Sequence, residues 1–370
     1  MRHPRRPSRA IAAALSAAFI VAACGDDADP VADTANDGTV TTTSDDTGAV
    51  GNEADEPTEG TTVEQAPTET TPTNETPVAT ATSEAGVLDD QVLVDMTDSV
   101  FDFATFGIVP AGNIYGSAFA PVVFDQIENV DQAVVDAILA TPDITAGAEL
   151  NREALAAAEP DLILLSPTFE AVYNTSQDEL EQIAPVQMID EEVSWQERTR
   201  LVAELAGRED EAEERIEAID DKLNELEQRV AEADLTGTTV SILRVLGDDV
   251  WAFTQQSTAA MFAERIGFVL PPAQQQNQPE ASPFQDYVAL IPLSAEEFGD
   301  HAGDFVIVAV NAPVDDPSTA FTSPVVAELI PALGQGAAID VPWFLWALNS
   351  IVGVEQMVQD LEAVVDELTS

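Results

Sequence analysis

From about residue 87 to the C-terminus, short apolar runs alternate with segments of helical periodicity. The runs with the length and composition of buried strands are residues 92–96, 161–165, 186–189, 240–245, 250–253 and 305–310. Helical stretches separate them, and residues 151–159 directly precede the second run. Asp98 is placed to cap the helix after the first strand. Strands separated by helices predict parallel sheets with helices on both faces.

The most regular helical pattern spans residues 209–233. Its apolar positions are separated by alternating steps of four and three residues, which places them on one helix face: Ala212, Ile216, Ile219, Leu223, Leu226, Val230 and Ala233. A coiled coil is the alternative, but no heptads flank the segment. Strand-rich segments lie on both sides of it. We therefore expect one long helix that connects an N-lobe to a C-lobe.

The N-terminal part differs in composition from the rest of the chain. Residues 25–86 are rich in Thr, Asp, Glu, Pro, Gly and Ala and contain no basic or aromatic residue. Such a segment buries too little apolar surface to offset its ordering entropy, so we expect a disordered tether. The expected organisation is a signal peptide at 1–23, a tether at 24–86, an N-lobe at 87–205, an interlobe helix at 206–235, and a C-lobe with a C-terminal helix at 236–370.

Cys24 is the only cysteine, and it follows an apolar run over residues 10–23 that four Arg precede. The run is too short to span a bilayer comfortably. Val21-Ala22-Ala23-Cys24 resembles the lipobox of bacterial lipoproteins, in which the Cys thiol is lipidated and becomes the new N-terminus. The resemblance implies export, cleavage before Cys24 and lipid anchoring on the outer face of the cell membrane, or on the periplasmic side. A transmembrane anchor and an ordinary secretory signal with an incidental Cys are the alternatives.

The charge balance excludes several classes of protein. The chain has 13 basic and 68 acidic residues, and four of the basic residues precede Cys24. A nucleic-acid binder needs many more Lys and Arg side chains to neutralise phosphates. Docking on anionic headgroups through a basic patch is equally disfavoured. The acidic surface suggests adaptation to a saline medium, where screening shortens self-repulsion.

The order of motifs over residues 87–370 resembles that of periplasmic-binding proteins of the iron-siderophore and vitamin B12 type. Residues 149–166 contain an Asn-x-Glu pattern followed by Pro-Asp-Leu-Ile, and the matching later pieces are residues 180–186, 195–212, 240–253, 263–267 and 293–298. The resemblance implies an α/β fold with two lobes. Each lobe would hold a mainly parallel sheet with helices on both faces, and a long rigid interlobe helix would join them, as in class III of these proteins.

The resemblance also implies a function. The protein would be a monomeric substrate-binding component of an ABC importer that captures a ferric siderophore in the interlobe cleft and delivers it to the permease. No cofactor is expected, because iron would be carried only as part of the ligand. Haem or a corrinoid is the alternative ligand, and a surface or sensor module without transport is the alternative role.

Candidate ligand contacts are an arginine and several aromatic residues. Arg244 lies in an otherwise apolar strand, where a charge is costly unless it is paired or lies at the strand end. It resembles the ligand-facing Arg of the siderophore branch, and a salt bridge at the rim is the alternative. The aromatic candidates are Trp251, Trp343, Trp346, Tyr115 and Tyr287. We expect one of Trp343 and Trp346 to face the cleft and the other to lie in the core.

Glu153 and Glu296 form a separate pair of candidates. Each is expected in the first turn of a helix, where a carboxylate also stabilises the helix dipole. In the family that the chain resembles, one Glu on each lobe docks with Arg residues of the transporter. The resemblance therefore implies a docking role for both.

An enzymatic function has little support. After Cys24 the chain has one His, His301, and no Cys. It has no Gly-rich phosphate loop, no Gly-x-Ser-x-Gly elbow and no His-Glu-x-x-His motif. One His also disfavours capture of zinc or manganese. No metal site is expected.

Overall fold

The computed structural model of the protein describes residues 91–127, 130–146, 149–190, 193–276, 289–311, 314, 316–322 and 327–370. The predictions for Cys24, for the signal peptide, for the tether and for Tyr287 lie outside the described residues. Within them, no helix combines the length and the apolar character needed to cross a membrane.

The N-lobe is built on a parallel sheet with strand order β2-β1-β5-β6. Its strands are β1 Leu93–Met96, β2 Gly112–Asn113, β5 Leu162–Leu165 and β6 Val186–Met188. β3 (Thr145–Ala146) and β4 (Glu149–Leu150) form a short antiparallel pair. The helices of this lobe are α2 Val100–Thr105, α3 Gly116–Phe124, α4 Gln132–Leu139, α5 Arg152–Ala157, α6 Pro167–Val172 and α7 Gln177–Leu180. The strands predicted near residues 92, 161 and 186 are confirmed.

The C-lobe sheet has the order β11-β10-β7-β8-β9. Its strands are β7 Val240–Leu246, β8 Asp249–Phe253, β9 Leu290–Leu293, β10 Phe305–Val310 and β11 Ala338–Pro342. β7, β10 and β11 run parallel, whereas β8 and β9 add antiparallel pairings. The sheet is therefore less uniformly parallel than expected. Gly247 and Asp248 form a two-residue turn in which Gly247 has a φ of 64°, and this turn folds β8 back on β7.

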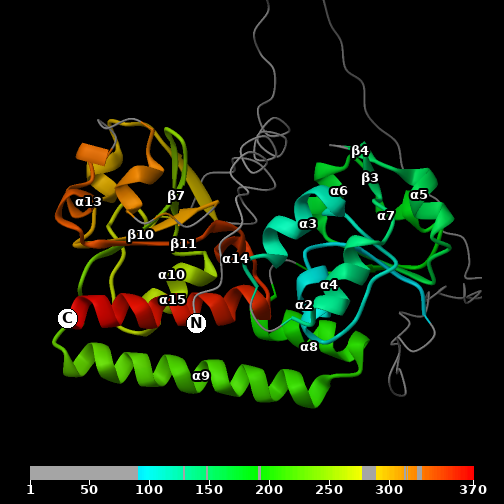
Figure 1. Ribbon diagram of the computed structural model, residues 1–370, viewed down its shortest axis with the longest axis horizontal. Helices are drawn as coiled ribbons and strands as arrows, with labels where there is room; N and C mark the ends of the chain where they lie inside the picture. Colours follow the sequence, from blue (N-terminus) through cyan, green and yellow to red (C-terminus); the bar gives the residue numbers. More distant parts are fainter. Residues whose placement is uncertain are drawn as a thin grey trace, which may run out of the picture. The chain divides into compact units, whose positions relative to one another are not determined.

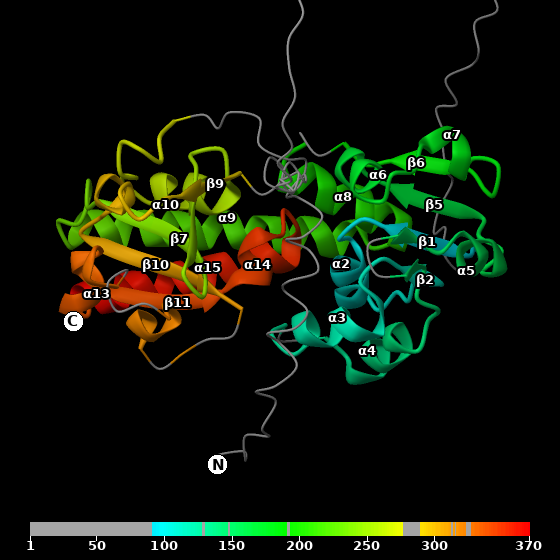
Figure 2. The ribbon, with the colours of Figure 1, turned by 90° about the horizontal axis from the view of Figure 1, so that it is seen from above.

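The remaining helices lie around the C-lobe sheet and between the lobes. They are α8 Trp195–Ala206, α9 Glu209–Glu232, α10 Thr258–Arg265, α13 Pro331–Gln335, α14 Trp343–Ala347 and α15 Ile351–Thr369, with short 3-10 helices η1 Phe298–His301 and η2 Pro317–Ala320. β11 leads directly into α14, and α15 follows it at the C-terminus (Figure 2).

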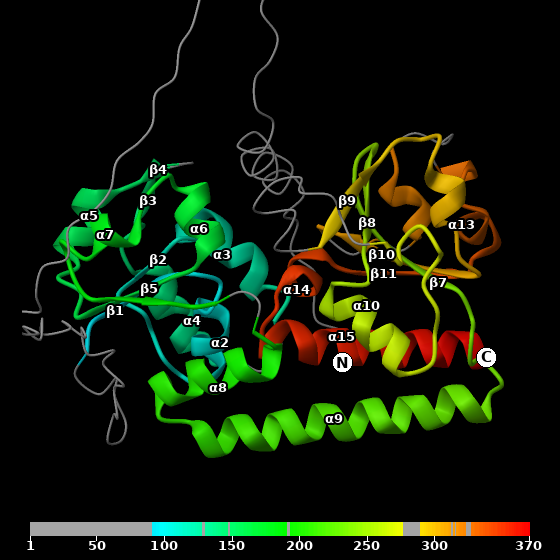
Figure 3. The same cartoon turned by 180° about the vertical axis from the view of Figure 1, so that it is seen from behind.

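The long helix α9 is confirmed almost residue for residue. α8 starts with a capping box at Ser194 and ends at Gly207, whose left-handed φ of 63° turns the chain into α9. The apolar positions of α9 are buried and it runs beside α15 (Figures 1 and 3). Ion pairs reinforce this contact, such as that of Lys222 with Glu362 at 2.7 Å. The apolar stripe therefore pairs with a helix of the same chain.

The largest hydrophobic core joins both halves of the protein. It contains Phe101 of α2, Leu226 of α9, Ile242 of β7 and Leu361 of α15. A second core lies on the other face of the C-lobe sheet, and two smaller cores surround the N-lobe sheet. Since α2 shares its core with α15, we infer that the lobes resist large hinge motion.

The expected capping role of Asp98 is wrong. Helix α2 starts after Ser99, and no side chain caps it. Asp98 instead forms an ion pair with Arg198 of α8, and both side chains are almost completely buried. The full charge of the buried Arg198 guanidinium attracts the Asp98 carboxylate more strongly than the partial charge of a helix N-terminus does, because the low dielectric strengthens the ionic interaction.

Candidate functional site

Arg244 projects from the same face of β7 as Val240 and Ile242. Alternate residues of a strand share a face, and the two preceding members of this row are buried in the core that includes α10, α14 and α15. Arg244 lies farther toward the carboxyl end of the strand and is 9% exposed. Ligands of open α/β sheets bind at this end of the strands.

Two indole rings hold the Arg244 guanidinium. Its Cζ atom lies 4.5 Å from the ring centroid of Trp251 and 4.2 Å from that of Trp343. Trp251 is directly opposite Arg244 in the β7–β8 register. Trp343 is the first residue of α14, immediately after β11. A desolvated contact of this kind contributes about 2 kcal/mol or more, so the two rings fix the position of the cation.

The charge of Arg244 is only partly compensated by the protein. Burial lowers the pKa of Arg244 to about 10, and the Asp249 carboxylate opposes this shift. Arg244 remains protonated at neutral pH. Its Nε has no hydrogen-bond partner, and no carboxylate pairs with it among the described residues. The rim salt bridge considered from the sequence is therefore not found there. A ligand oxygen at the exposed edge of the guanidinium would compensate this charge.

Trp343 and Trp346 are both buried, at 3% and 2% exposed, and both belong to the largest hydrophobic core, so the expected division into one cleft residue and one core residue is not seen. They differ in their polar contacts: Nε1 of Trp346 donates a hydrogen bond of 2.6 Å to Oδ2 of Asp360 on α15. Burial raises the pKa of Asp360 to about 6, although this hydrogen bond opposes the shift. Of the two tryptophans, Trp343 contacts Arg244, whereas Trp346 joins α14 to α15 in the core.

Tyr115 lies in the N-lobe at the start of α3. It is partly buried and packs edge-on against Phe101, with 4.8 Å between the ring centroids. Its backbone N–H donates to Oδ1 of Asn113 at 3.0 Å. The structure thus brings together Arg244, Trp251 and Trp343, whereas Tyr115 belongs to the N-lobe.

The two candidate docking residues differ in local structure. Glu153 is exposed in the first turn of α5, which Asn151 caps. The expectation that Glu296 also begins a helix is wrong, because it lies in an exposed turn before η1. Its neighbour Glu297 accepts hydrogen bonds from the N–H and Oγ of Ser294 at 2.8 and 2.7 Å. This closed turn leaves room for only a short 3-10 helix before β10.

Sequence reasoning missed a group of buried carboxylates in β1 and in the segment that follows it. Asp95 accepts hydrogen bonds from the N–H and Oγ1 of Thr97 at 3.1 and 2.6 Å. Burial raises the pKa of Asp95 to about 7, against the opposing effects of Thr97 and Arg198. Asp102 is also fully buried. The available signal was Asp95 itself, an acidic residue in an apolar strand.

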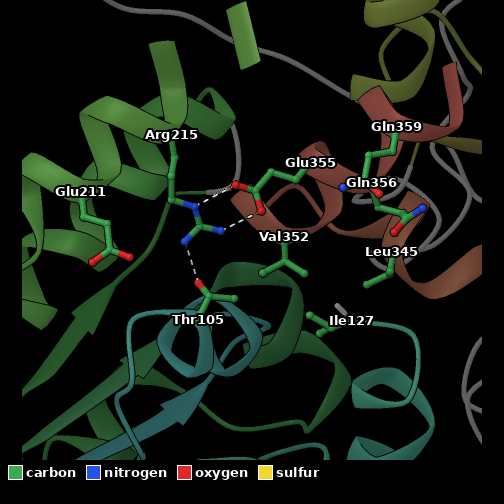
Figure 4. Close-up of a pocket in the computed structure, with 9 residues that line it drawn as sticks. All are labelled: Thr105, Ile127, Glu211, Arg215, Leu345, Val352, Glu355, Gln356 and Gln359. Carbon is green, nitrogen blue, oxygen red and sulfur yellow. Dashed lines mark hydrogen bonds and ion pairs between the residues drawn. The ribbon is translucent and has the colours of Figure 1, made fainter. Parts of the chain in front are cut away.

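A pocket of about 240 Å³ opens where α2, α9 and α15 approach one another (Figure 4). Nε and Nη2 of Arg215 each lie 2.8 Å from a carboxylate oxygen of Glu355, and Nη1 donates to Oγ1 of Thr105 at 2.8 Å. The pocket is smaller than typical ligand sites, and its cation is already paired. We therefore assign the candidate ligand site to Arg244 and its two tryptophans.

Two lobes with central sheets, a long connecting helix and a buried cation at the carboxyl ends of strands define a solute-binding protein. Residues 100–333 match the family described as "Periplasmic binding protein". The chain belongs to this family, as the sequence resemblance to its iron-siderophore type predicted. Members of the family are exported binding proteins, so the protein is not an enzyme.

Similar proteins include both a sequence relative and solved structures. The ferric enterobactin-binding periplasmic protein FepB of Escherichia coli is 30% identical over 123 residues, which cover 33% of this chain and 38% of that protein. Staphylococcus aureus SirA complexed with staphyloferrin B has a TM-score of 0.55 at 16% identity and covers 77% of this chain and 95% of that one. S. aureus FhuD2 with bound ferrioxamine B has a TM-score of 0.54 at 16% identity, covering 75% and 99%. These structures confirm the two-lobed fold.

Proposed function

We propose that the protein is an extracytoplasmic solute-binding lipoprotein of an ABC importer that captures a ferric siderophore. The observation that carries this proposal is the Arg244 guanidinium, which is held over two indole rings, is 9% exposed, and has no carboxylate partner among the described residues. A ferric siderophore presents oxygen atoms around the metal and flat or apolar surfaces between them. An arginine donor and aromatic planes recognise those two features.

The relatives support the same class of ligand. FepB is named for ferric enterobactin, and the SirA and FhuD2 structures contain staphyloferrin B and ferrioxamine B. On this proposal iron is cargo, and the protein needs no cofactor of its own.

Delivery to the permease is the second part of the proposal. Glu153 and Glu296 are both exposed, on separate lobes, and a carboxylate on each lobe can pair with arginines of a transporter. Lipid at Cys24 would hold the monomer near the membrane, and the acidic segment that follows would let it reach the permease. The resemblance of residues 21–24 to a lipobox supports this anchoring.

Titration of tryptophan fluorescence tests the ligand class. We expect saturable quenching of the purified full-length protein by a ferric siderophore, because Trp251 and Trp343 lie at the proposed site. Ferric hydroxamates, ferric catecholates, haem and cobalamin are compared. If only haem or cobalamin binds, the alternative ligands replace the siderophore, and if nothing binds, a non-transport role is favoured.

Substitution of the arginine tests the site. Arg244→Ala removes the donor and is expected to weaken binding by roughly tenfold or more, the equivalent of one charged hydrogen bond. Arg265→Ala is the matched control, because Arg265 donates only to Asn224 at an exposed position. Equal affinities of the two variants would remove Arg244 from the site.

A further inference from the structure

The positions of the cationic side chains limit the charge of the ligand. Nine Lys and Arg residues follow Cys24, and every one of them lies within the described residues. The segments that are not described after residue 90 therefore add no Lys or Arg to any site. His301 is buried, and burial lowers its pKa, so it adds no charge at neutral pH.

Eight of the nine cations lie away from the Arg244 site or are already paired. Six form ion pairs with carboxylates: Arg152, Arg198, Arg200, Arg215, Lys222 and Arg229. Arg208 is exposed at the junction of α8 and α9, and Arg265 donates to Asn224 on α9. Apart from Arg152 on α5, these residues all belong to α8, α9 and α10 or to the junction of α8 and α9. Figure 3 shows where these three helices lie. Arg244 is the one cation that remains for a ligand.

The immediate surroundings of Arg244 contain a negative charge. Asp249 lies on the same face of β8 as Trp251, two residues before it, and its carboxylate acts on the Arg244 guanidinium. Asp249 is exposed and so can face an incoming ligand. The site thus combines one cation, one nearby anion and two indole planes, which together carry almost no net charge.

Ferric siderophores differ in charge in a way that this site can distinguish. In a ferric tris-catecholate, three dianionic catecholates outweigh Fe³⁺ and leave a triple negative charge. In a ferric tris-hydroxamate, three monoanionic hydroxamates balance Fe³⁺ and leave a neutral core with outward-facing oxygens and apolar linkers. Unbalanced like charges at an interface are strongly unfavourable. At this site a trianionic ligand would be attracted by one guanidinium and repelled by Asp249. It would also be repelled by the acidic chain as a whole, which has 68 acidic residues.

We infer that the Arg244 site selects electroneutral ferric tris-hydroxamates and discriminates against triply anionic ferric tris-catecholates. This inference rests on the proposed function of the same site. Arg244 donates to a hydroxamate oxygen, the partly buried indole of Trp251 packs against the uncharged linkers, and the buried indole of Trp343 holds the guanidinium in position. The inference names a different ligand class from the enterobactin of the E. coli relative, because the cation count of this chain does not fit a trianion.

Paired titrations test the inference. Ferrichrome serves as the neutral tris-hydroxamate and ferric enterobactin as the trianionic tris-catecholate, both with the purified full-length protein at low and high NaCl. We expect ferrichrome to bind at least roughly a hundredfold more tightly at low salt. Its affinity should change little with salt, since a neutral ligand has no net charge to screen. Equal or tighter binding of ferric enterobactin, or a steep salt dependence for ferrichrome, overturns the inference.

A charge-reversal variant tests whether the discrimination between the two ligands arises at the Arg244 site. Asp249→Lys adds a cation beside Trp251 and is expected to tighten ferric enterobactin binding by roughly tenfold or more, so that the preference for ferrichrome over ferric enterobactin falls by at least that factor. Glu217→Lys makes the same change in net charge on the exposed face of α9 and should alter neither affinity. An equal gain in both variants would show that only the global charge matters, which overturns the local selection. If neither complex binds the unmodified protein but haem or cobalamin does, the proposed siderophore function fails together with the inference.

Discussion

Asp102 of α2 accepts a hydrogen bond of 3.3 Å from the backbone N–H of Val352 in the first turn of α15. Asp102 belongs to the N-lobe and α15 to the C-lobe, so a fully buried carboxylate caps a helix across the lobes. Ser350, the N-cap residue of α15, also hydrogen-bonds to Asp102. This contact helps to explain why α2 and α15 share one core.

The protonation of Asp102 should make stability depend on pH. Burial raises the pKa of Asp102 to about 7, with Arg215 lowering it and Glu355 raising it. The unfolded chain loses this proton near the ordinary pKa of 3.8, so the unfolded state is favoured increasingly as pH rises from about 4 to about 7. The stability contributed by protonated Asp102 is present below about pH 4 and is lost above about pH 7.

Asp102→Asn tests this dependence by urea unfolding between pH 4 and pH 8. The amide keeps an acceptor for Val352 but does not titrate, so the variant should lose less stability than the unmodified protein over this range, by on the order of a few kcal/mol. Glu217→Gln is the exposed control, and its profile should match that of the unmodified protein. Identical pH profiles for Asp102→Asn and the unmodified protein would contradict the prediction.

Arg198→Met should destabilise the protein strongly. The change removes the buried ion-pair partner of Asp98 and also the hydrogen bond that Nη2 donates to Ser99 Oγ at 3.1 Å. A loss of about 3–5 kcal/mol in the free energy of unfolding is expected. The double variant Arg198→Met with Asp98→Leu should recover most of it, because an apolar pair replaces the ions. A double variant no more stable than the single one would argue against this account.

Gly353→Ala should disturb the ligand site through α14. A Cβ atom at position 353 would lie 2.5 Å from the carbonyl oxygen of Leu345 and 2.6 Å from that of Leu348. The backbone that leaves α14 must move away from α15, at a cost of about 1–3 kcal/mol. Trp343 begins α14, so its contact with Arg244 should loosen and ligand affinity should fall as well.

Gly334→Ala is the matched control for Gly353→Ala, since a Cβ there meets no atom within 4 Å. Chemical unfolding and ligand titration of the two variants provide the comparison. Unchanged stability of Gly353→Ala would mean that α14 and α15 pack less closely than described.

Removal of the candidate docking carboxylates should impair uptake of the ligand into the cell but not binding of the ligand by the protein. Glu153→Ala combined with Glu296→Ala is expected to reduce cellular uptake of the ferric siderophore several-fold while the binding affinity of the purified protein stays unchanged, because both side chains are exposed. Glu181→Ala with Glu217→Ala removes the same charge at other exposed positions. Normal uptake by the first variant would exclude the docking role.

Cys24→Ala tests the lipid anchor. We expect the variant to leave the membrane fraction, to bind ligand with unchanged affinity, and to support slower uptake, because the binder is no longer concentrated near its permease. Fractionation and uptake measurements give the two readouts. Undiminished uptake by the released protein would show that anchoring does not serve delivery.

Local patterns predicted most secondary structure correctly. The strands near residues 92, 161, 186, 240, 250 and 305 and the helix α9 were predictable because a run of apolar residues or a stripe at helical spacing is a property of neighbouring residues. The reversal of β8 also had a local signal in Gly247-Asp248, which reads as a hairpin turn. The helix expected at Glu296 failed because Glu297 closes a turn on Ser294 instead.

The candidate site was only partly predictable. Arg244 could be predicted because it is a charged residue in an apolar strand. Trp251 and Trp343 could be predicted as separate candidate ligand contacts, but not as partners of Arg244. The sequence left open which of Trp343 and Trp346 faces the cleft, since both lie in one short segment. The packing of α14 on α15 buries both rings, and it places Trp343 beside Arg244 whereas Trp346 donates a hydrogen bond to Asp360.

The sequence by itself determined the family, the two sheets with a long helix between them, and the scarcity of cations, because periodicity, motif order and composition are properties of the linear chain. The tertiary structure decided which charges meet. Strand register set Arg244 opposite Trp251, and lobe packing buried Asp102 against α15 and Asp98 against Arg198. Ion pairing and cation–π contacts act over a few ångströms between residues far apart in sequence, so only the folded arrangement selects the partners.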